Sequence, residues 1–321
     1  MTAVATFDRS VPFDPAPGEE SLSSSSTDVV DDEAEEIPQL SPRMQLIRGP
    51  LVMMLVLSAA LFIQVVLVSS SQESAAQGRS FDSFRAQLAK GTAPIGPTDS
   101  DGRQLPIGAS VAYLEIPAIS VTQVVGEGTT PSALFGGPGH RRDTPLPGQV
   151  GTSVLFGRRA AYGGPFARID ELKKADLIQV TTGQGVFHYR VLGVRRQGDP
   201  IPPPPADGSS RLILTTAAGA AFLPNGVVRV DADLVGDAVV GPARLVSYAS
   251  LPHEEKVMAS DARTLWALAL WLQALILLSL AAVWAWHRWG RAQAWVVFLP
   301  PLMLVCLFAT GEATRLLPNL L

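Results

Sequence analysis

The chain has 321 residues, a hydrophobic content of 47% and a formal net charge of −4. The apolar residues gather in a few uncharged blocks, which is typical of a membrane protein that carries one soluble unit. This charge balance gives no support to nucleic-acid binding. Because Cys306 is the only cysteine and lies inside an apolar block, the region before that block contains no thiol and no disulfide.

Residues 1–48 are expected to form an acidic, disordered tail in the cytoplasm. Residues 1–47 carry ten acidic side chains against two arginines, a net charge of −8, together with a run of serines and few aromatic residues. Such a segment cannot bury enough apolar surface to fold by itself. Two interpretations stay open: a solvated tail without a specific partner, and a tail that binds a basic partner or is phosphorylated.

Three apolar blocks are long enough to cross a hydrocarbon core of about 30 Å. The predicted transmembrane helices are 49–72, 263–287 and 292–311, the last interrupted by Pro300-Pro301. Arginines before the first block and in the loop between the second and third place both of these ends in the cytoplasm. Residues 73–262 and the tail 312–321 are then extracytoplasmic, in a multi-pass protein of the plasma membrane. The first block is also compatible with a cleaved signal peptide, although its leading region is long for one.

The extracytoplasmic region divides into a stalk, a β-rich domain and a linker. Residues 73–107 are polar and rich in Ser, Gly and Pro, with a short helix expected near Phe81–Lys90. From 108 to 240, short apolar runs alternate with Gly and Pro, which indicates strands and turns, and 241–262 link this domain to the second membrane helix. The predicted strands are Ala109–Ile116, Val150–Phe156, Leu177–Thr181, Gly185–Gly193, Arg211–Thr216 and Val227–Val235. Short helical turns are predicted at Ser132–Phe135 and Pro165–Glu171.

Several ordered blocks between Ala112 and about Val235 carry a family resemblance. They are Tyr113–Pro117, Gly137–His140, Thr144–Gly151, Gly164–Phe166, Leu172–Ile178, Leu212–Ala217 and Ala232–Leu234. In content and order these blocks resemble the sortases, which are membrane-anchored cysteine transpeptidases that act on cell-surface proteins of Gram-positive bacteria. The resemblance implies a mainly β fold: a closed β-barrel with short helical turns, flanked here by one N-terminal and two C-terminal transmembrane helices. The actinobacterial type with extra C-terminal helices is the most similar.

The positions at which this family keeps its catalytic residues are altered. Sortase chemistry uses a cysteine thiolate as the nucleophile, a histidine as acid and base, and an arginine beside the oxyanion. The resemblance places Ala217, Arg158 and Val227 at these three positions. A methyl group cannot attack a carbonyl, and a guanidinium does not release a proton near neutral pH. Arg229 projects from the same face as Val227, about 6.6 Å further along the strand.

Few other side chains offer a replacement for the lost chemistry. Thr216 carries a hydroxyl next to Ala217, but successive strand residues point to opposite faces. His140, His188 and His253 are the histidines of the extracytoplasmic region. His140 lies in a Gly-His turn, where a histidine is expected to have a structural hydrogen-bonding role.

A groove can persist where the chemistry has been lost. Arg158 either presents a fixed positive charge to a carboxylate or another anion, or fills space and pairs with Asp231 or Asp233. The polyproline run at 200–205 is stiff and extended, and it is interpreted as a docking ligand, a lid over the groove or a rigid loop. The candidate groove residues are His140, Arg158, Pro202, Pro203, Thr216 and Arg229.

The sequence therefore predicts a membrane-anchored, sortase-like protein of the Gram-positive cell envelope that lacks catalytic activity. Its expected role is to bind or scaffold surface proteins or other envelope partners. The alternative is an active sortase-type transpeptidase or hydrolase with an unconventional nucleophile. No metal site, cofactor or nucleic-acid partner is predicted, because the β-rich domain has no clustered acids and its glycine-rich turns lack the lysine of a phosphate loop.

Overall fold

The computed structural model describes residues 55–56, 58–261 and 264–321. The predicted tail at 1–48 and the start of the predicted helix at 49–72 lie outside the described residues. The described end of that helix passes through a π-helical turn, Gln64–Val68, into α2 (Ser69–Lys90). Helix α2 is thus longer than the short helix predicted near its C-terminal end, and it stops at Gly91, whose φ of 65° ends a helix readily.

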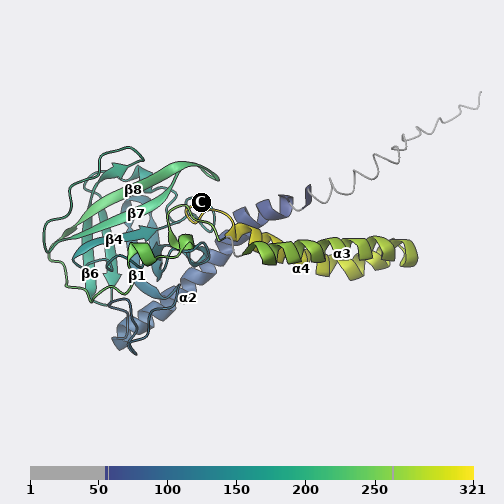
Figure 1. Ribbon diagram of the computed structural model, residues 1–321, viewed down its shortest axis with the longest axis horizontal. Coiled ribbons are helices and arrows are strands. Elements are labelled where there is room, and N and C mark those ends of the chain that lie inside the picture. The colour runs from purple at the N-terminus through teal and green to yellow at the C-terminus, as the bar shows by residue number, and fades with distance from the viewer. Residues whose placement is uncertain (1–54, 57, 262–263) are drawn as a thin grey trace, which may run out of the picture. The chain divides into compact units, whose positions relative to one another are not determined.

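Eight strands close into a barrel, which confirms the predicted mainly β architecture. Their order around the barrel is β1-β2-β3-β4-β7-β8-β6-β5, and Figure 1 labels five of them, β1, β4, β6, β7 and β8, within one β-rich body. The strands are β1 (Ser110–Ile116), β2 (Val121–Glu127), β3 (Gly139–His140), β4 (Gly151–Phe156), β5 (Leu177–Thr182), β6 (Gly185–Arg195), β7 (Ser210–Ala220) and β8 (Leu223–Val235).

The six predicted strands correspond to β1 and to β4 through β8, with ends shifted by a few residues. Strands β2 and β3 were missed. Only a single 3-10 turn, Pro117–Ile119, and Ser120 at φ 55° separate β1 from β2. With so short a connection, the sequence pattern did not separate β2 from β1. β3 has two residues and leaves no periodic pattern. The helical turns predicted near 132–135 and 165–171 are 3-10 turns at Ala133–Phe135 and Ile169–Glu171.

Side-chain alternation in β7 separates an inner face from an outer face. Leu212, Leu214 and Ala218 belong to the buried barrel core. Ile213 and Ala217, at the intervening positions, contribute to a second apolar cluster. Because alternate strand residues point to opposite faces, this second cluster lies on the outside of the barrel wall.

Two long apolar helices follow the barrel in sequence: α3 (Leu265–Trp289) and α4 (Arg291–Arg315). Within the described residues, their segments of 22 and 23 residues are long and apolar enough to cross a membrane. The two helices pack together, with the rings of Trp271 and Phe308 stacked 4.8 Å apart. Pro300-Pro301 lies inside α4 without interrupting it.

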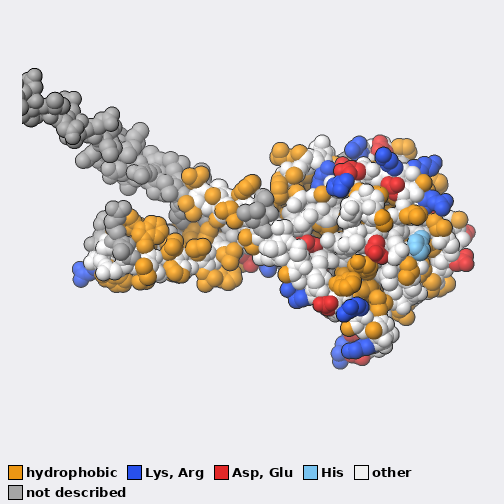
Figure 2. Space-filling view, turned by 180° about the vertical axis from the view of Figure 1, so that it is seen from behind, with side chains coloured by type: hydrophobic (Ala, Val, Ile, Leu, Met, Phe, Trp, Pro, Cys, Tyr) orange, Lys and Arg blue, Asp and Glu red, His pale blue; other side chains and the backbone are white. Residues whose placement is uncertain are grey.

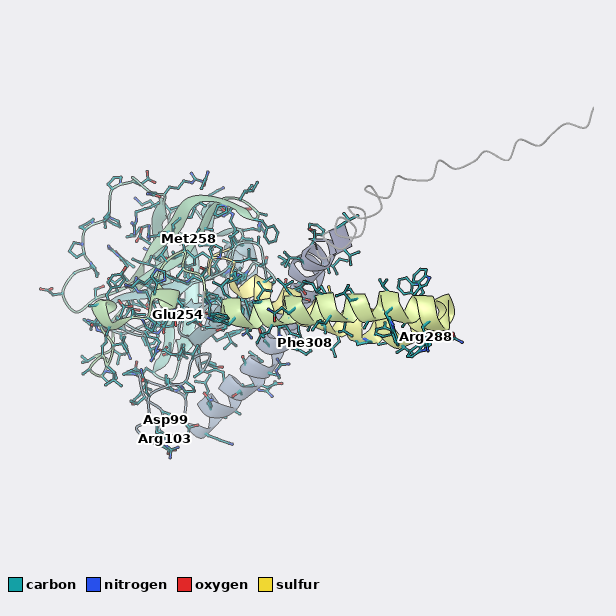
Figure 3. All side chains as sticks on the ribbon, turned by 45° about the vertical axis from the view of Figure 1, so that its right-hand side comes forward. Asp99, Arg103, Glu254, Met258, Arg288 and Phe308 are labelled. Carbon is teal, nitrogen blue, oxygen red and sulfur yellow. The ribbon has the colours of Figure 1, made fainter. Side chains whose placement is uncertain are left out.

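The outer surface of this helical pair differs from that of the barrel. Figure 2 shows hydrophobic side chains over most of the pair, whereas charged side chains are spread over the barrel. Figure 3 labels Phe308 along the pair and Arg288 at the end where α3 turns into α4. An apolar helical surface of this extent is typical of a lipid-facing one.

Candidate functional site

The outer cluster forms around a cross-strand pair near the end of β7. Ala217 pairs directly with Val227 of β8, and directly opposed residues on one face of a sheet have Cβ atoms about 5 Å apart. Both side chains are buried. The buried members of the cluster are Leu134, Val154, Phe156, Ala217, Val227 and Leu320, and Ile213, Val257 and Met258 pack against them.

Arg158 lies two residues beyond the end of β4 and is completely buried. Its guanidinium carbon is 5.1 Å from the ring centroid of Phe135 and 5.2 Å from that of Tyr162, so two cation–π contacts hold it. Nη2 donates a hydrogen bond to the carbonyl of Pro131 at 3.0 Å, and Nη1 donates to the main-chain oxygen of Leu321 at 3.3 Å. The side chain therefore fills a defined slot beside the outer cluster.

No acidic side chain of the described residues forms an ion pair with Arg158. The expected pairing with Asp231 or Asp233 is wrong, because Arg195 holds the first at 2.7 Å and Arg211 holds the second at 2.6 Å. Burial lowers the pKa of Arg158 to about 10. The guanidinium thus stays charged at neutral pH, and its Nε has no hydrogen-bond partner among the described residues.

The two threonines before Ala217 face opposite sides of the barrel wall. Thr216 is fully buried and its hydroxyl donates to the carbonyl of Gly157 at 2.8 Å, as the strand alternation predicts for a residue on the other face from Ala217. Thr215 shares the outer face with Ala217, and its buried hydroxyl has no partner within the described part of the chain. Arg229 pairs across the strands with Thr215, two residue pairs along from the pair of Ala217 and Val227.

His140 is held in a buried polar corner formed by β2, β3 and the following turn. Its Nδ1 lies 2.8 Å from a carboxylate oxygen of Glu127, and its Nε2 lies 3.0 Å from the carbonyl of Pro145 and 3.2 Å from the hydroxyl of Thr144. Burial alone would lower the pKa of His140, but the Glu127 carboxylate and the Pro145 carbonyl outweigh it and raise the pKa. Both ring nitrogens are engaged in contacts that stabilise the fold.

Comparison with known proteins supports the sortase family for part of the chain. Residues 114–217 match the family model of the sortase domain. The barrel is a sortase domain. Sortase D of Bacillus subtilis (strain 168) is 34% identical over 85 residues, which are 26% of this chain and 41% of that protein. The chain therefore spans less than half the length of this curated relative.

Solved sortase structures resemble the chain more distantly in sequence. The Clostridium perfringens Sortase D5 transpeptidase is 22% identical, with a TM-score of 0.41, and the match covers 52% of this chain and 100% of that one. Sortase E1 from Streptomyces coelicolor, solved with a tripeptide in the active site, is also 22% identical, with a TM-score of 0.36, covering 41% of this chain and 91% of that one.

The structure brings together the three residues that the sequence resemblance assigns to the catalytic positions. Ala217 and Val227 lie in the outer cluster with Leu320, and Arg158 contacts the next residue, Leu321. Sequence reasoning missed this C-terminal contribution. The available signal was an apolar stretch, 316–321, that was expected to lie outside the membrane and so needed another surface to cover it.

The polyproline run lies elsewhere on the sortase domain. The carbonyl of Pro203 accepts a hydrogen bond from Arg211, which lies near the beginning of β7, whereas Ala217 lies near its end. Ile201 is 80% exposed. The contact of Pro203 with Arg211 thus gives no support to a lid over Ala217, which is buried in the same apolar cluster as Leu320. Among the described residues, no group of three or more His, Cys, Asp or Glu side chains is placed to hold a metal ion.

Proposed function

We propose that this chain is a membrane-anchored sortase-fold protein of the cell envelope that binds a partner and does not catalyse transpeptidation. The observation that carries the proposal is Ala217, which stands at the family's nucleophile position. It offers a methyl group and is buried in the same apolar cluster as Leu320. Nucleophilic catalysis needs a group that can attack the scissile carbonyl, and the sequence has no thiol before Cys306 in α4.

Among the described residues, the surroundings of Ala217 also lack a general base. Arg158 keeps its proton at neutral pH and is fixed between two aromatic rings, so it cannot shuttle protons as a histidine does. The Thr216 hydroxyl points away from Ala217 and donates to a carbonyl. His140 is committed to Glu127 on one side and to the following turn on the other. These contacts argue against the alternative of an active enzyme with an unconventional nucleophile.

The proposed location is the plasma membrane of a Gram-positive, actinobacterial cell. The apolar surfaces of α3 and α4 support anchoring, and the arginines between them support a cytoplasmic turn. In this topology the N-terminus is cytoplasmic and the barrel is outside. Its partners are then surface or envelope proteins, and the acidic tail at 1–48 offers a separate contact for a basic cytoplasmic partner.

A turnover assay tests the absence of catalysis. The full chain in lipid nanodiscs and its Leu320→Asp variant, which uncovers Ala217, are incubated with cell-wall sorting peptides and hydroxylamine. We expect no product above a no-protein control, while an active sortase with its own peptide serves as the positive control. Product that disappears when Thr216→Val or His140→Gln is introduced would overturn the proposal and establish the enzyme alternative.

A further inference from the structure

The last six residues described, 316–321, fold onto the altered sortase site and are called the plug here. Figure 1 marks this end of the chain beside the barrel. The plug leaves the end of α4 and makes a tight turn in which the amide of Leu321 donates to the carbonyl of Pro318 at 3.1 Å. Its position brings Leu320 into the cluster with Ala217 and Val227.

Main-chain and side-chain hydrogen bonds fix the plug in a single register. The amide of Asn319 donates to the carbonyl of Ala259 at 2.8 Å, and the amide of Arg159 donates to the carbonyl of Leu320 at 3.0 Å. The side-chain amide of Asn319 donates to the carbonyls of Thr129 at 2.9 Å and Lys256 at 2.8 Å. Asn319 and Leu320 are both completely buried, so the site has a polar slot followed by an apolar slot.

The fit is incomplete in two places. Arg158 Nε and the side-chain oxygen of Asn319 are both buried without a hydrogen-bond partner among the described residues. A buried polar atom without a partner weakens an association, because its hydration is lost and nothing replaces it. A ligand that made the same contacts as the plug and also offered an acceptor to Arg158 Nε would therefore bind with higher affinity.

We propose that residues 316–321 are a resident ligand that keeps this site closed, and that a partner peptide enters by displacing them. The second half of this inference rests on the proposed binding function. Because α4 tethers the plug, its local concentration at the site is high and a free peptide competes at a disadvantage. The site therefore selects against weak, unspecific peptides. The ligand class that it fits is a short peptide with a carboxamide side chain followed by a leucine-sized apolar one.

Cysteine accessibility tests the plug without any partner or turnover. Ala217→Cys is introduced into the full chain in nanodiscs with Cys306→Ala, and labelling by a charged maleimide is followed by intact mass. Val186→Cys, at a position 53% exposed on the barrel, is the matched control. We expect Ala217→Cys to label much more slowly than the control. Deleting 316–321, or Leu320→Asp in the full-length chain, should accelerate it by about tenfold or more, as expected from losing a buried leucine.

The control cysteine should label at the same rate with and without the plug. Leu320→Ala gives a third chain, whose barrel core is untouched because Leu320 belongs to the outer cluster alone. A hexapeptide with the sequence of 316–321, added to the deletion variant, should slow labelling again, whereas a scrambled hexapeptide should not.

The outcomes separate the two proposals. Labelling of Ala217→Cys at the rate of Val186→Cys in the intact chain would show that the plug does not reside in the site. Labelling that stays equally slow after all three changes would show that other residues cover Ala217. Either result overturns the plug and leaves the absence of catalysis standing. Protection lost on removing the plug but not restored by the hexapeptide would overturn binding by displacement.

Discussion

Replacing Leu320 with alanine should release the plug without unfolding the barrel. The side chain is completely buried in the outer cluster, and removing such a leucine costs about 2–5 kcal/mol. At about 1.4 kcal/mol for each factor of ten, the lower figure raises the equilibrium constant for plug opening by about thirtyfold. The barrel core contains no plug residue, so the loss should be confined to local opening.

Hydrogen exchange measured by mass spectrometry reads this out directly. Exchange at 316–321 and at the amide of Arg159, which donates to Leu320, should accelerate by about thirtyfold. Peptides from β7 and β8 should exchange as before. Leu223→Ala, at a position 74% exposed on β8, is the control and should change neither region. Unchanged exchange of the plug, or acceleration of β7 and β8 together with it, would refute the reasoning.

Three further substitutions test the contacts around the site. Arg158→Lys should lower the melting temperature, because one ammonium cannot make both cation–π contacts and both carbonyl bonds. Glu127 helps to raise the pKa of His140. The stability that this pair contributes is therefore complete below about pH 6.5 and is lost as pH rises through the raised pKa. Glu127→Gln should remove this dependence of the melting temperature on pH. Gly157→Ala, whose methyl carbon would lie 2.4 Å from a phenylalanine ring, should cost about 1–3 kcal/mol in chemical denaturation, whereas Gly193→Ala, in open space, should cost little.

Each of these predictions has its own contrary result. A melting temperature unchanged by Arg158→Lys would mean that the stacked guanidinium adds nothing to stability. A pH slope that persists in Glu127→Gln would assign it to groups other than the buried His140 pair. Equal stability of the Gly157→Ala and Gly193→Ala variants would show that the ring beside Gly157 moves aside without strain.

The barrel was predictable because its strands carry local patterns. Alternation in β6 and the apolar runs of β4, β7 and β8 are visible within windows of six to thirteen residues. The two-residue β3 has no window in which to show periodicity. Helix α2 was underestimated because its polar, weakly amphipathic sequence is typical of a stalk, and only its contacts with the barrel make it a packing element, as in the tilted ring contact of Phe81 with Tyr113 at 5.3 Å.

The assignment of the candidate site stays a prediction from the sequence, whereas the contacts of its residues could be seen only in the structure. The resemblance assigns Ala217, Arg158 and Val227 to the catalytic positions from sequence order alone. The partners of Arg158 depend on which arginines lie nearest to Asp231 and Asp233 in the folded structure. Asp233 lies directly across from Arg211 on the neighbouring strand. An arginine in this position forms the ion pair more readily than a more distant one such as Arg158.

The plug was hidden for a related reason. Leu320 and Ala217 share one cluster although more than a hundred residues of sequence separate them. A segment of six residues is too short to show a periodic pattern, so its contacts could not be predicted. What the sequence did contain was the combination of an apolar tail with a predicted extracytoplasmic location. Such a tail needs a surface to bury its leucines, and the outer cluster supplies it.

The most direct test of the central claim is the intact mass of the Leu320→Asp variant after incubation with a cell-wall sorting peptide. With Ala217 uncovered and no thiol beside it, the mass should remain that of the unmodified protein. An added mass equal to the acyl part of the cleaved peptide, mapped to any residue of the barrel, would contradict the account, because a covalent intermediate is the signature of a working transpeptidase.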